Sequence, residues 1–329
     1  MPVLYLGDEH IRQIGLNWKA LVDSMENTVR IIDSGDYKQP IKPYLRYQSA
    51  VNRIIAMPAF VGGRLQTAGI KWIASFPANI DIGLPRAHSI TILNDAATGI
   101  PRAMLNTALP SAARTAAVSG LLIRHYLQAQ GESRRLKLGI IGFGPVGRLH
   151  YDLCSQLYAE RIDDVYLYDP RGCDMENADL NHVDPAFRNR TQLTSSWQQL
   201  YYECDLIITC TVSKERYIDI APAKGSLLLD ISLRDYKVDA LIDIHTIIVD
   251  DWEEVCRENT DIEALHHHRG LTKEQTYSLA DVVCHNVLGR ISSEESVLFC
   301  PMGMAVFDIA AADYFVERAS ALSIGVQLQ

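Results

Sequence analysis

The sequence predicts an α/β protein that combines a doubly wound parallel sheet with a second, discontinuous α+β domain. Three observations lead to this fold class. Beyond residue 131, helical segments alternate with apolar strands that lack polar–apolar alternation, as parallel strands buried on both faces do. Before residue 130, short β-rich runs follow one another directly, which favours an antiparallel or mixed sheet. Residues 302–322 are helical without a strand partner, so we expect them to return to the first domain.

The composition limits the class of protein. The chain has 329 residues, about twice the length of a typical domain, and is 48% hydrophobic and 22% charged. A net charge of −9 argues against nucleic acid as a partner, and no apolar run approaches the ~20 residues that span a membrane. The N-terminus lacks a secretory signal pattern. Seven cysteines without a Cys-x-x-Cys pair indicate reduced thiols, so we expect a cytoplasmic protein with neither disulfides nor a bound metal.

In the first domain, residues 17–35 have the pattern of a helix. Asn17 suits the N-cap, Gly35 suits the position after the last turn, and apolar residues repeat on one face. Five β-rich runs follow, and residues 94–99 between the last two have the composition of a hairpin turn. Residues 111–128 predict a mostly buried, alanine-rich helix. A polar segment then ends this domain, which comprises residues 1–130 and is completed by residues 301–329.

The second domain, residues 131–300, repeats strands and helices. The predicted helices are residues 145–160 and the short segment SSWQQLYYE, and the predicted strands are LKLGIIG, DVYLYDP, DLIITC, SLLLDIS and TIIVDD. The C-terminal helix is expected to be amphipathic, with Val306, Ile309, Ala310, Tyr314 and Phe315 facing a core. The consecutive histidines 266–268 are expected in a solvated loop, because adjacent residues do not converge on one metal ion.

A glycine-rich loop stands between the first strand and first helix of the second domain. Its first glycine makes the tight turn, its second lets the backbone approach a pyrophosphate, and its third permits close helix packing. The helix N-terminus adds free N–H groups that attract phosphate. This context predicts a Rossmann-type dinucleotide-binding domain. The loop consists of Gly142, Phe143, Gly144, Pro145, Val146 and Gly147.

The acidic residue that ends the next strand bears on the choice of dinucleotide. Asp169 lies about 22 residues beyond the last glycine of the loop. A carboxylate there accepts hydrogen bonds from the ribose hydroxyls and repels a 2′-phosphate, which favours NAD over NADP. Arg171 is a complication, because an arginine at that position can bind a 2′-phosphate.

Several further segments resemble one family over essentially the whole chain. They are NRIIAMP, AGIKWIASFPAN, GFGPVG and the long block ILNDAATGIPRAMLNTALPSAARTAAVSG, together with an aspartate after SLLLD. The chain resembles the ornithine cyclodeaminase/mu-crystallin family. KPYLRYQ, RAHS, YLYDPRG and ISLRD are most similar to a subgroup that makes diaminopropionate for siderophores.

The resemblance implies an activity and its partners. The expected reaction is the NAD-dependent oxidation of N-(2-amino-2-carboxyethyl)-L-glutamate to an imine, which is then hydrolysed to 2-oxoglutarate and L-2,3-diaminopropionate. The alternatives are an ornithine cyclodeaminase-type lyase that uses NAD catalytically, another amino- or imino-acid dehydrogenase, and a cofactor binder without turnover. The resemblance also implies a homodimer in which the first-domain sheets pack together.

The family's functional positions carry over residue by residue. Asp235 takes the catalytic position, and Lys71 both binds substrate and assists catalysis. The remaining substrate contacts fall on Arg46, with Arg53 as a rival, and on Met57 and Arg114. Arg234, which is not a family position, is a further candidate for a substrate contact because it stands beside Asp235. Further cofactor contacts fall on Thr115, Thr211, Val212 and Ser232. Cyclodeaminases usually have Gly-Gly before the aspartate, whereas this chain has Leu233-Arg234, which argues against cyclodeamination.

The residues themselves leave alternatives open. Lys71 also suits the outer face of an edge strand, and Asp235 also suits a turn cap, with Asp230 as the rival base. Arg114 near a helix N-terminus is unfavourable for the helix dipole, so an anion nearby would explain it. Arg234 suits a substrate with more carboxylates than ornithine, but also suits solvent or a pair with Asp230.

Overall fold

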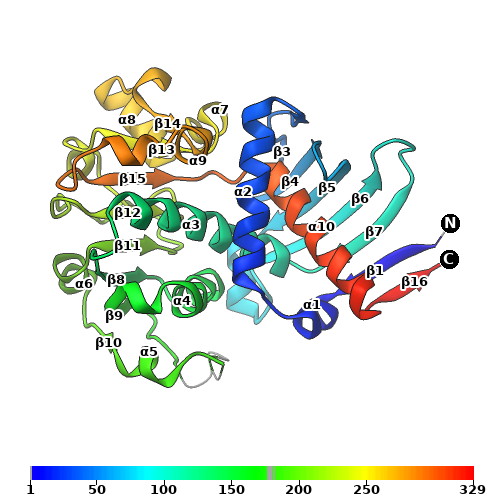
Figure 1. Cartoon of the computed structure of the whole chain (residues 1–329), viewed down its shortest axis with the longest axis horizontal. Helices are drawn as coiled ribbons and strands as arrows, with labels where there is room; N and C mark the ends of the chain where they lie inside the picture. Colours follow the sequence, from blue (N-terminus) through cyan, green and yellow to red (C-terminus); the bar gives the residue numbers. More distant parts are fainter. Residues whose placement is uncertain (1, 176–179, 181) are drawn as a thin grey trace. The chain divides into compact units, whose positions relative to one another are not determined.

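The computed structural model describes residues 2–175, 180 and 182–329. The chain forms two compact units, of which the first comprises Met1–Ala117 with Met304–Gln329 and the second comprises Val118–Gly303 (Figure 1). Each unit is built on a sheet of its own. The C-terminal segment belongs to the first unit, so this unit is discontinuous in sequence.

The sheet of the first unit has eight strands among the described residues, in the order β16-β1-β7-β6-β5-β4-β2, with β3 paired to β4. β1 and β7 are parallel, whereas the other pairs are antiparallel, so the sheet is mixed. The strands are β1 (Val3–Gly7), β2 (Tyr37–Lys38), β3 (Tyr44–Tyr47), β4 (Ser49–Val61), β5 (Thr67–Ser75), β6 (Ala87–Asp95), β7 (Pro101–Asn106) and β16 (Val326–Leu328).

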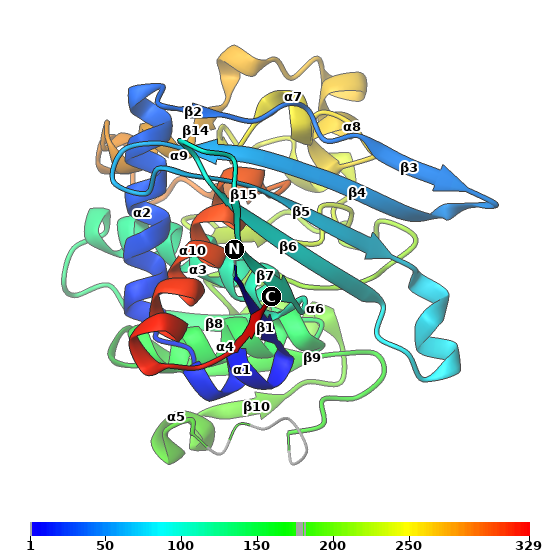
Figure 2. The ribbon, with the colours of Figure 1, turned by 90° about the vertical axis from the view of Figure 1, so that its right-hand side faces the viewer.

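Helices α2 and α10 pack against each other, and α10 covers β4 and β5 (Figure 2). α2 confirms the expected caps, because the Asn17 side chain accepts a hydrogen bond from the Ala20 N–H and Gly35 is left-handed. The expectation of an amphipathic C-terminal helix is wrong for the first half of α10, where residues 305–313 are all buried. The helical elements of this unit are α1 (Asp8–Ile14), α2 (Trp18–Ser34), η1 (Pro77–Ile82) and α10 (Ala305–Leu322), and α3 (Leu109–Ala129) begins here and continues into the second unit.

The sheet of the second unit has eight parallel strands among the described residues, in the order β10-β9-β8-β11-β12-β15-β13-β14. Its central strands are entirely buried, as their unbroken apolar sequences predict. The strand β15, which separates β12 from β13, was not among the predicted strands. The strands are β8 (Leu136–Ile141), β9 (Ile162–Tyr168), β10 (Thr191–Leu193), β11 (Leu206–Thr209), β12 (Leu227–Asp230), β13 (Thr246–Val249), β14 (Tyr277–Ser278) and β15 (Val297–Cys300).

The histidines 266–268 lie in the last turn of α8, so their expected place in a loop is wrong. They are exposed there, and cationic or polar side chains suit the negative end of a helix. Within the described residues, no group of His, Cys, Asp and Glu side chains is arranged to hold a metal ion. The helical elements of this unit are α4 (Pro145–Leu157), η2 (Ala159–Arg161), α5 (Pro185–Asn189), α6 (Trp197–Glu203), η3 (Val238–Leu241), α7 (Trp252–Val255), α8 (Asp261–Arg269), η4 (Lys273–Gln275), α9 (Leu279–Val283) and η5 (Val287–Arg290).

None of the helices that the structure describes has both the length and the apolar character needed to cross a membrane.

Candidate functional site

The glycine-rich loop connects β8 to α4 in the geometry that a bound pyrophosphate requires. Gly142 has a φ of 96°, and a Cβ there would lie 2.5 Å from the Cys210 carbonyl oxygen. A Cβ on Gly147 would lie 2.1 Å from the Gly142 carbonyl oxygen, so only glycine allows α4 to start this close to the loop. A Cβ on Gly144, the N-cap of α4, would meet nothing closer than 4.0 Å. The backbone is therefore accessible where a phosphate would bind, and the loop fits a dinucleotide.

Phe143, Pro145 and Val146 complete this loop in different ways. Phe143 is buried and packs edge-on against Tyr151, which anchors the loop to α4. Pro145 occupies the first turn of α4, where its missing N–H costs no hydrogen bond. The Val146 carbonyl oxygen lies 2.8 Å from His150 Nδ1.

Asp169 follows β9 and faces this loop. Its carboxylate accepts hydrogen bonds from the backbone N–H groups of Phe143 and Arg171, both at 2.9 Å, and lies 3.3 Å from Arg171 Nε. Burial alone would raise the pKa of Asp169, but the Arg171 side chain and these N–H groups hold it below its usual value. Asp169 is therefore ionised at neutral pH. Arg171, which complicated the choice of cofactor, contacts this carboxylate while its side chain stays 59% exposed.

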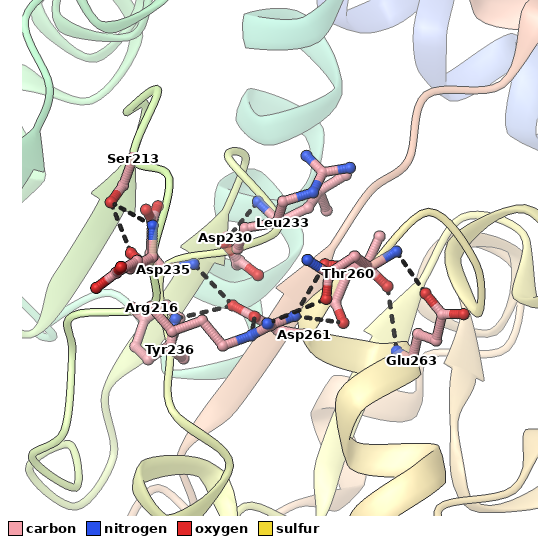
Figure 3. A network of polar contacts seen from close by, with 12 residues as sticks. Ser213, Arg216, Asp230, Leu233, Asp235, Tyr236, Thr260, Asp261 and Glu263 are labelled. Carbon is pink, nitrogen blue, oxygen red and sulfur yellow. Dashed lines mark hydrogen bonds and ion pairs between the residues drawn. The ribbon is translucent and has the colours of Figure 1, made fainter. Parts of the chain in front are cut away.

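A network of buried aspartates lies beyond the carboxyl ends of β11 and β12 (Figure 3). Asp235 is fully buried, and its Oδ1 accepts a hydrogen bond of 2.6 Å from the Thr211 hydroxyl. Asp235 Oδ2 has no hydrogen-bond partner among the described residues. Burial raises the pKa of Asp235, although the nearby hydroxyl groups of Ser232, Thr211 and Thr209 oppose this. A carboxylate with a raised pKa and an unoccupied oxygen is suited to accept a proton.

Two other aspartates hold the backbone around Asp235. Asp261 Oδ2 accepts the N–H groups of Asp235 and Tyr236 at 2.9 and 2.8 Å, and Oδ1 accepts Arg216 Nε at 2.5 Å (Figure 3). Asp230 Oδ1 accepts the Thr209 hydroxyl and the Leu233 N–H, and its Oδ2 accepts the Cys300 thiol at 3.4 Å. Both Asp230 oxygens thus accept hydrogen bonds, whereas only Oδ1 of Asp235 does.

The protonation of these neighbours follows from their partners. Burial, with the negative charges of Asp261 and Asp235, raises the pKa of Asp230 well above its usual value. Asp261 has an arginine and two backbone donors that favour its ionised form, whereas the donors to Asp230 are uncharged. Because both Asp230 oxygens already hold the turn, Asp235 is the better candidate for the base.

The dipeptide Leu233-Arg234 stands before Asp235, where cyclodeaminases usually have Gly-Gly. Leu233 has a φ of 67°, the left-handed region that glycine adopts freely and that costs a leucine ~1–2 kcal/mol. Its N–H donates to Asp230, and its carbonyl accepts the Asp261 N–H at 2.8 Å. Arg234 donates to the Glu258 carbonyl from Nε and Nη2 at 3.2 and 2.8 Å, instead of pairing with Asp230.

The predicted cofactor contacts after β11 and β12 lie near this turn. The Thr211 N–H donates to the Ser232 hydroxyl at 2.7 Å, which ties the two strand ends together. Val212 is 51% exposed and follows directly. Thr115, in α3 of the first unit, donates its hydroxyl to the Ser111 carbonyl of its own helix at 2.9 Å.

In the first unit, Lys71 and Arg114 meet at a carboxylate that the sequence did not single out. Lys71 is fully buried in β5, so its alternative position on an outer strand face is wrong. Its Nζ lies 2.7 Å from Asp308 Oδ2, and Arg114 Nε lies 2.8 Å from Asp308 Oδ1. Ser111 donates to Asp308 Oδ1 at 3.1 Å and accepts from Lys71 Nζ at 3.0 Å. Asp308 is the anion that explains Arg114 near the start of α3.

Asp308 lies in α10 among apolar residues of the stretch AVFDIAAA. An acidic residue inside such a helix has to be paired when it is buried, and this was the available signal in the sequence. What the sequence did not contain was the identity of its partners in β5 and α3.

The other predicted substrate contacts differ in burial. Met57 is buried in β4 and lies opposite Lys71 in the register of β4 with β5. Arg46 is exposed and stacks on the Tyr44 ring, with its guanidinium carbon 5.0 Å from the ring centre. Lys42, which the sequence argument passed over, is buried and close enough for its charge to lower the pKa of Lys71. The structure thus brings Lys42 toward Lys71 and leaves Arg46 at the surface.

Comparison with known proteins places these features in one family. The model of the ornithine cyclodeaminase/mu-crystallin family matches residues 10–323, which is nearly the whole chain. The chain belongs to this family. Among curated members, it is 31% identical to the N-((2S)-2-amino-2-carboxyethyl)-L-glutamate dehydrogenase of Staphylococcus aureus, over 99% of this chain and 98% of that protein. It is also 25% identical to the alanine dehydrogenase of Archaeoglobus fulgidus, over 100% of this chain and 99% of that protein.

Solved structures of similar proteins have the same fold. The Δ1-pyrroline-2-carboxylate reductase of Thermococcus litoralis, in complex with NADH and L-proline, matches with a TM-score of 0.87 at 21% identity. The alignment covers 99% of this chain and 100% of that chain. An archaeal alanine dehydrogenase dimer with bound NAD matches with a TM-score of 0.82 at 24% identity, over 100% and 99% of the two chains. The predicted fold class is therefore confirmed.

Proposed function

We propose that this protein is an NAD-dependent dehydrogenase that oxidises the secondary amine N-(2-amino-2-carboxyethyl)-L-glutamate. The resulting imine is hydrolysed to 2-oxoglutarate and L-2,3-diaminopropionate, a building block for siderophores. The staphylococcal relative named for this substrate, at 31% identity over almost the full length, supports the choice of substrate. Other members of the family are named alanine dehydrogenase and pyrroline-2-carboxylate reductase, which supports oxidation or reduction at a carbon–nitrogen bond.

The observation that carries the proposal is the buried, unpartnered Oδ2 of Asp235. Hydride leaves the α-carbon of an amine only when the nitrogen lone pair is free, so the bound amine has to lose a proton. Asp235, with its raised pKa, accepts that proton directly or through a water. Once Asp235 has passed this proton on to water, its carboxylate stabilises the cationic imine of the substrate as it forms.

Lys71 and Arg114 bind carboxylates of the substrate in this proposal. The glutamate conjugate carries three carboxylates, whereas ornithine carries one, so a site rich in cations suits the conjugate better. Arg114 supplies a planar fork for a carboxylate, and Lys71 supplies a compact charge that also moves protons during hydrolysis of the imine. Met57 lines the strand beside Lys71. Arg46 and Arg234 remain further candidates for carboxylate contacts.

NAD, when bound, would accept the hydride from the α-carbon. The N–H groups at the start of α4 and the loop from Gly142 to Gly147 would hold its pyrophosphate, and Asp169 would hold the adenosine ribose. Thr115, Thr211, Val212 and Ser232 are the proposed contacts to the rest of the cofactor. Orientation of the substrate by the cations is the positioning contribution of the protein.

The proposal is tested by incubating the purified protein with NAD and N-(2-amino-2-carboxyethyl)-L-glutamate. We expect one NADH per substrate consumed, with 2-oxoglutarate and 2,3-diaminopropionate identified by mass spectrometry. L-Ornithine, L-alanine and L-proline serve as controls. Release of ammonia from ornithine without net NADH would instead establish a cyclodeaminase, and NADH binding without turnover of any amine would establish a cofactor binder.

The choice of cofactor gives a separate prediction. Because Asp169 is ionised and sits beside the glycine-rich loop, we expect NADH to bind much more tightly than NADPH. Asp169→Ser removes the charge that repels a 2′-phosphate and releases Arg171. The difference in affinity between NADH and NADPH should therefore become smaller. Fluorescence titration of both cofactors measures it. Equal affinity of the unaltered protein for NADH and NADPH would contradict the role of Asp169.

We propose that the protein is a homodimer formed through the sheet of the first unit. β5 alternates between buried Lys71, on the side of α10, and Trp72, which is 44% exposed. The same unit exposes large apolar side chains, and exposed apolar surface is typical of an interface. These side chains include Ile41, Leu45, Tyr47, Val51, Trp72, Ile80, Ile82 and Leu84. Sedimentation equilibrium should give twice the mass of the chain, and a monomer would contradict this proposal.

A further inference from the structure

The carboxylate of Asp308 joins elements that are far apart in the sequence. It lies in the first turn of α10 and contacts Lys71 of β5 and Arg114 of α3, which precede it by 237 and 194 positions. Ser111 bridges the same carboxylate and the Lys71 ammonium. All three charged side chains are at least nine-tenths buried. Asp308 therefore determines where both cations lie.

A requirement for stability alone does not account for this charge. Burying an ion pair costs desolvation energy that its own attraction often fails to recover, and apolar residues of similar volume do as well or better. The neighbours of Asp308 in α10 are apolar, so an apolar residue would continue their pattern. The charge at this position is more easily explained by its effect on Lys71 and Arg114.

We propose that Asp308 is a positioning residue that holds Lys71 and Arg114 in one rigid arrangement in which both cations can bind the carboxylates of a substrate. This inference rests on the proposed function, in which Lys71 and Arg114 bind the substrate. Lys71, Arg114 and the buried Lys42 are three cations and Asp308 is one anion, so the cluster keeps an excess of positive charge for a substrate carboxylate. Without Asp308, the two cations would repel each other and separate.

The charges around Lys71 show how Asp308 controls its protonation. Asp308 of α10, Arg114 of α3 and Lys42, which precedes β3, are the charged groups that act on it. Its neighbours in register, Met57 of β4 and Thr91 of β6, carry no ionisable group. Burial and the two other cations lower the pKa of Lys71 to about 8, against the opposing charge of Asp308. Loss of that charge would lower the pKa of Lys71 further and increase the fraction of Lys71 that is neutral at pH 7.

Asp308→Asn tests the inference, because it keeps the shape of the side chain and removes the charge. If protonated Lys71 is needed to bind the substrate, kcat/KM of the unaltered protein falls above about pH 8. In Asp308→Asn we expect this alkaline fall to move down by about one pH unit or more. We also expect KM for the conjugate to rise more than kcat falls, with NADH affinity unchanged. Asp308→Glu, which restores the charge, should restore the position of the alkaline fall.

The matched control is Asp313→Asn in the same helix. Asp313 is also buried and pairs with Arg102 and Thr67, away from the proposed substrate contacts. This variant should lose stability but keep the alkaline fall and KM of the unaltered protein. If both variants change in the same way, or if Asp308→Asn keeps the normal KM and pH profile, the positioning role is wrong.

A readout without turnover separates this inference from the proposed function. The Nζ resonance of Lys71 in 15N-lysine-labelled protein, assigned with Lys71→Met, can be followed from pH 6 to 10 by NMR. A lower titration midpoint in Asp308→Asn supports the control of Lys71 by Asp308 even where the conjugate is not turned over. An unchanged midpoint overturns it even where the conjugate is the substrate. If Asp308→Asn does not fold, Asp308→Glu decides: it should keep the alkaline fall, because the charge is present, and raise KM, because its carboxylate is displaced. A normal KM in this variant would overturn the positioning role.

Discussion

Replacing Asp235 with asparagine should lower turnover by about 10²–10⁴-fold, because general-base catalysis by a positioned carboxylate contributes that much. At 1.36 kcal/mol per tenfold, this corresponds to about 3–5 kcal/mol of activation free energy. The asparagine keeps an oxygen for the Thr211 hydroxyl, and the Asp235 N–H still donates to Asp261. The turn should therefore fold and bind NAD. Steady-state kinetics with the conjugate, together with NADH titration, measures both expectations.

The pH profile of the same variant identifies the base. Burial raises the pKa of Asp235, so the unaltered protein should lose activity on acidification at a higher pH than an ordinary aspartate would cause. Activity falls on acidification because Asp235 acts as a base, and a base works only when it is unprotonated. In Asp235→Asn this acidic fall should disappear from the residual activity. A variant that retains normal turnover and the acidic fall would remove Asp235 from the mechanism.

Asp230→Asn is the comparison for this prediction. Asp230 holds the turn by accepting the Leu233 N–H, and an asparagine of the same shape keeps that contact. We therefore expect much smaller losses in turnover than for Asp235→Asn. The reverse result, with Asp230→Asn inactive and Asp235→Asn active, would assign the base to Asp230.

Arg114→Ala is expected to have the second largest effect. A buried substrate carboxylate that loses its partner costs about 2–5 kcal/mol, which is about 30-fold to several thousandfold in kcat/KM. Affinity for NADH should stay close to normal, because backbone groups of the glycine-rich loop bind the pyrophosphate. The variant should also be less stable, because the buried Asp308 loses the cationic partner Arg114 and is left with Lys71.

Arg102→Ala is the matched control for Arg114→Ala. Arg102 of β7 pairs with Asp313 of α10, the helix that also carries Asp308. Arg102 has no role in the proposed chemistry. Removal of the Arg102 side chain should lower the thermal stability and leave kcat/KM near normal. If Arg114→Ala turns over the conjugate as the unaltered protein does, its assignment to a substrate carboxylate is wrong.

The elements that were predicted well depend on residues near one another in sequence. Asn17 caps α2, and the turn between β6 and β7 is held by Asp95, whose side chain accepts the Thr98 N–H. The unbroken apolar runs of β8, β11, β12 and β13 appear as buried parallel strands. The short strand β15 was missed, because four apolar residues are too few to distinguish a strand from a buried loop or helix.

The family resemblance singled out Asp235, Lys71 and Arg114 as candidates but not all of their neighbours. It placed a substrate contact on Arg46, which the structure leaves exposed on Tyr44, and passed over the buried Lys42. The two residues lie only four positions apart in sequence. In an irregular segment, polar–apolar alternation in the sequence does not predict which of two nearby cations is buried. The packing of the segment in the folded protein determines this.

By itself, the sequence determined the α/β class, the glycine-rich loop with Asp169, and the return of the C-terminal helix to the first unit. These follow from hydrophobic periodicity and turn chemistry, which act over a few residues. Tertiary structure alone decided which charges meet. A buried carboxylate such as Asp308 or Asp261 must be paired, but the chain folds Lys71, Arg114 and Arg216 onto them from distant positions. The need for a partner is local, because it arises from desolvation, while the partner itself is set by packing.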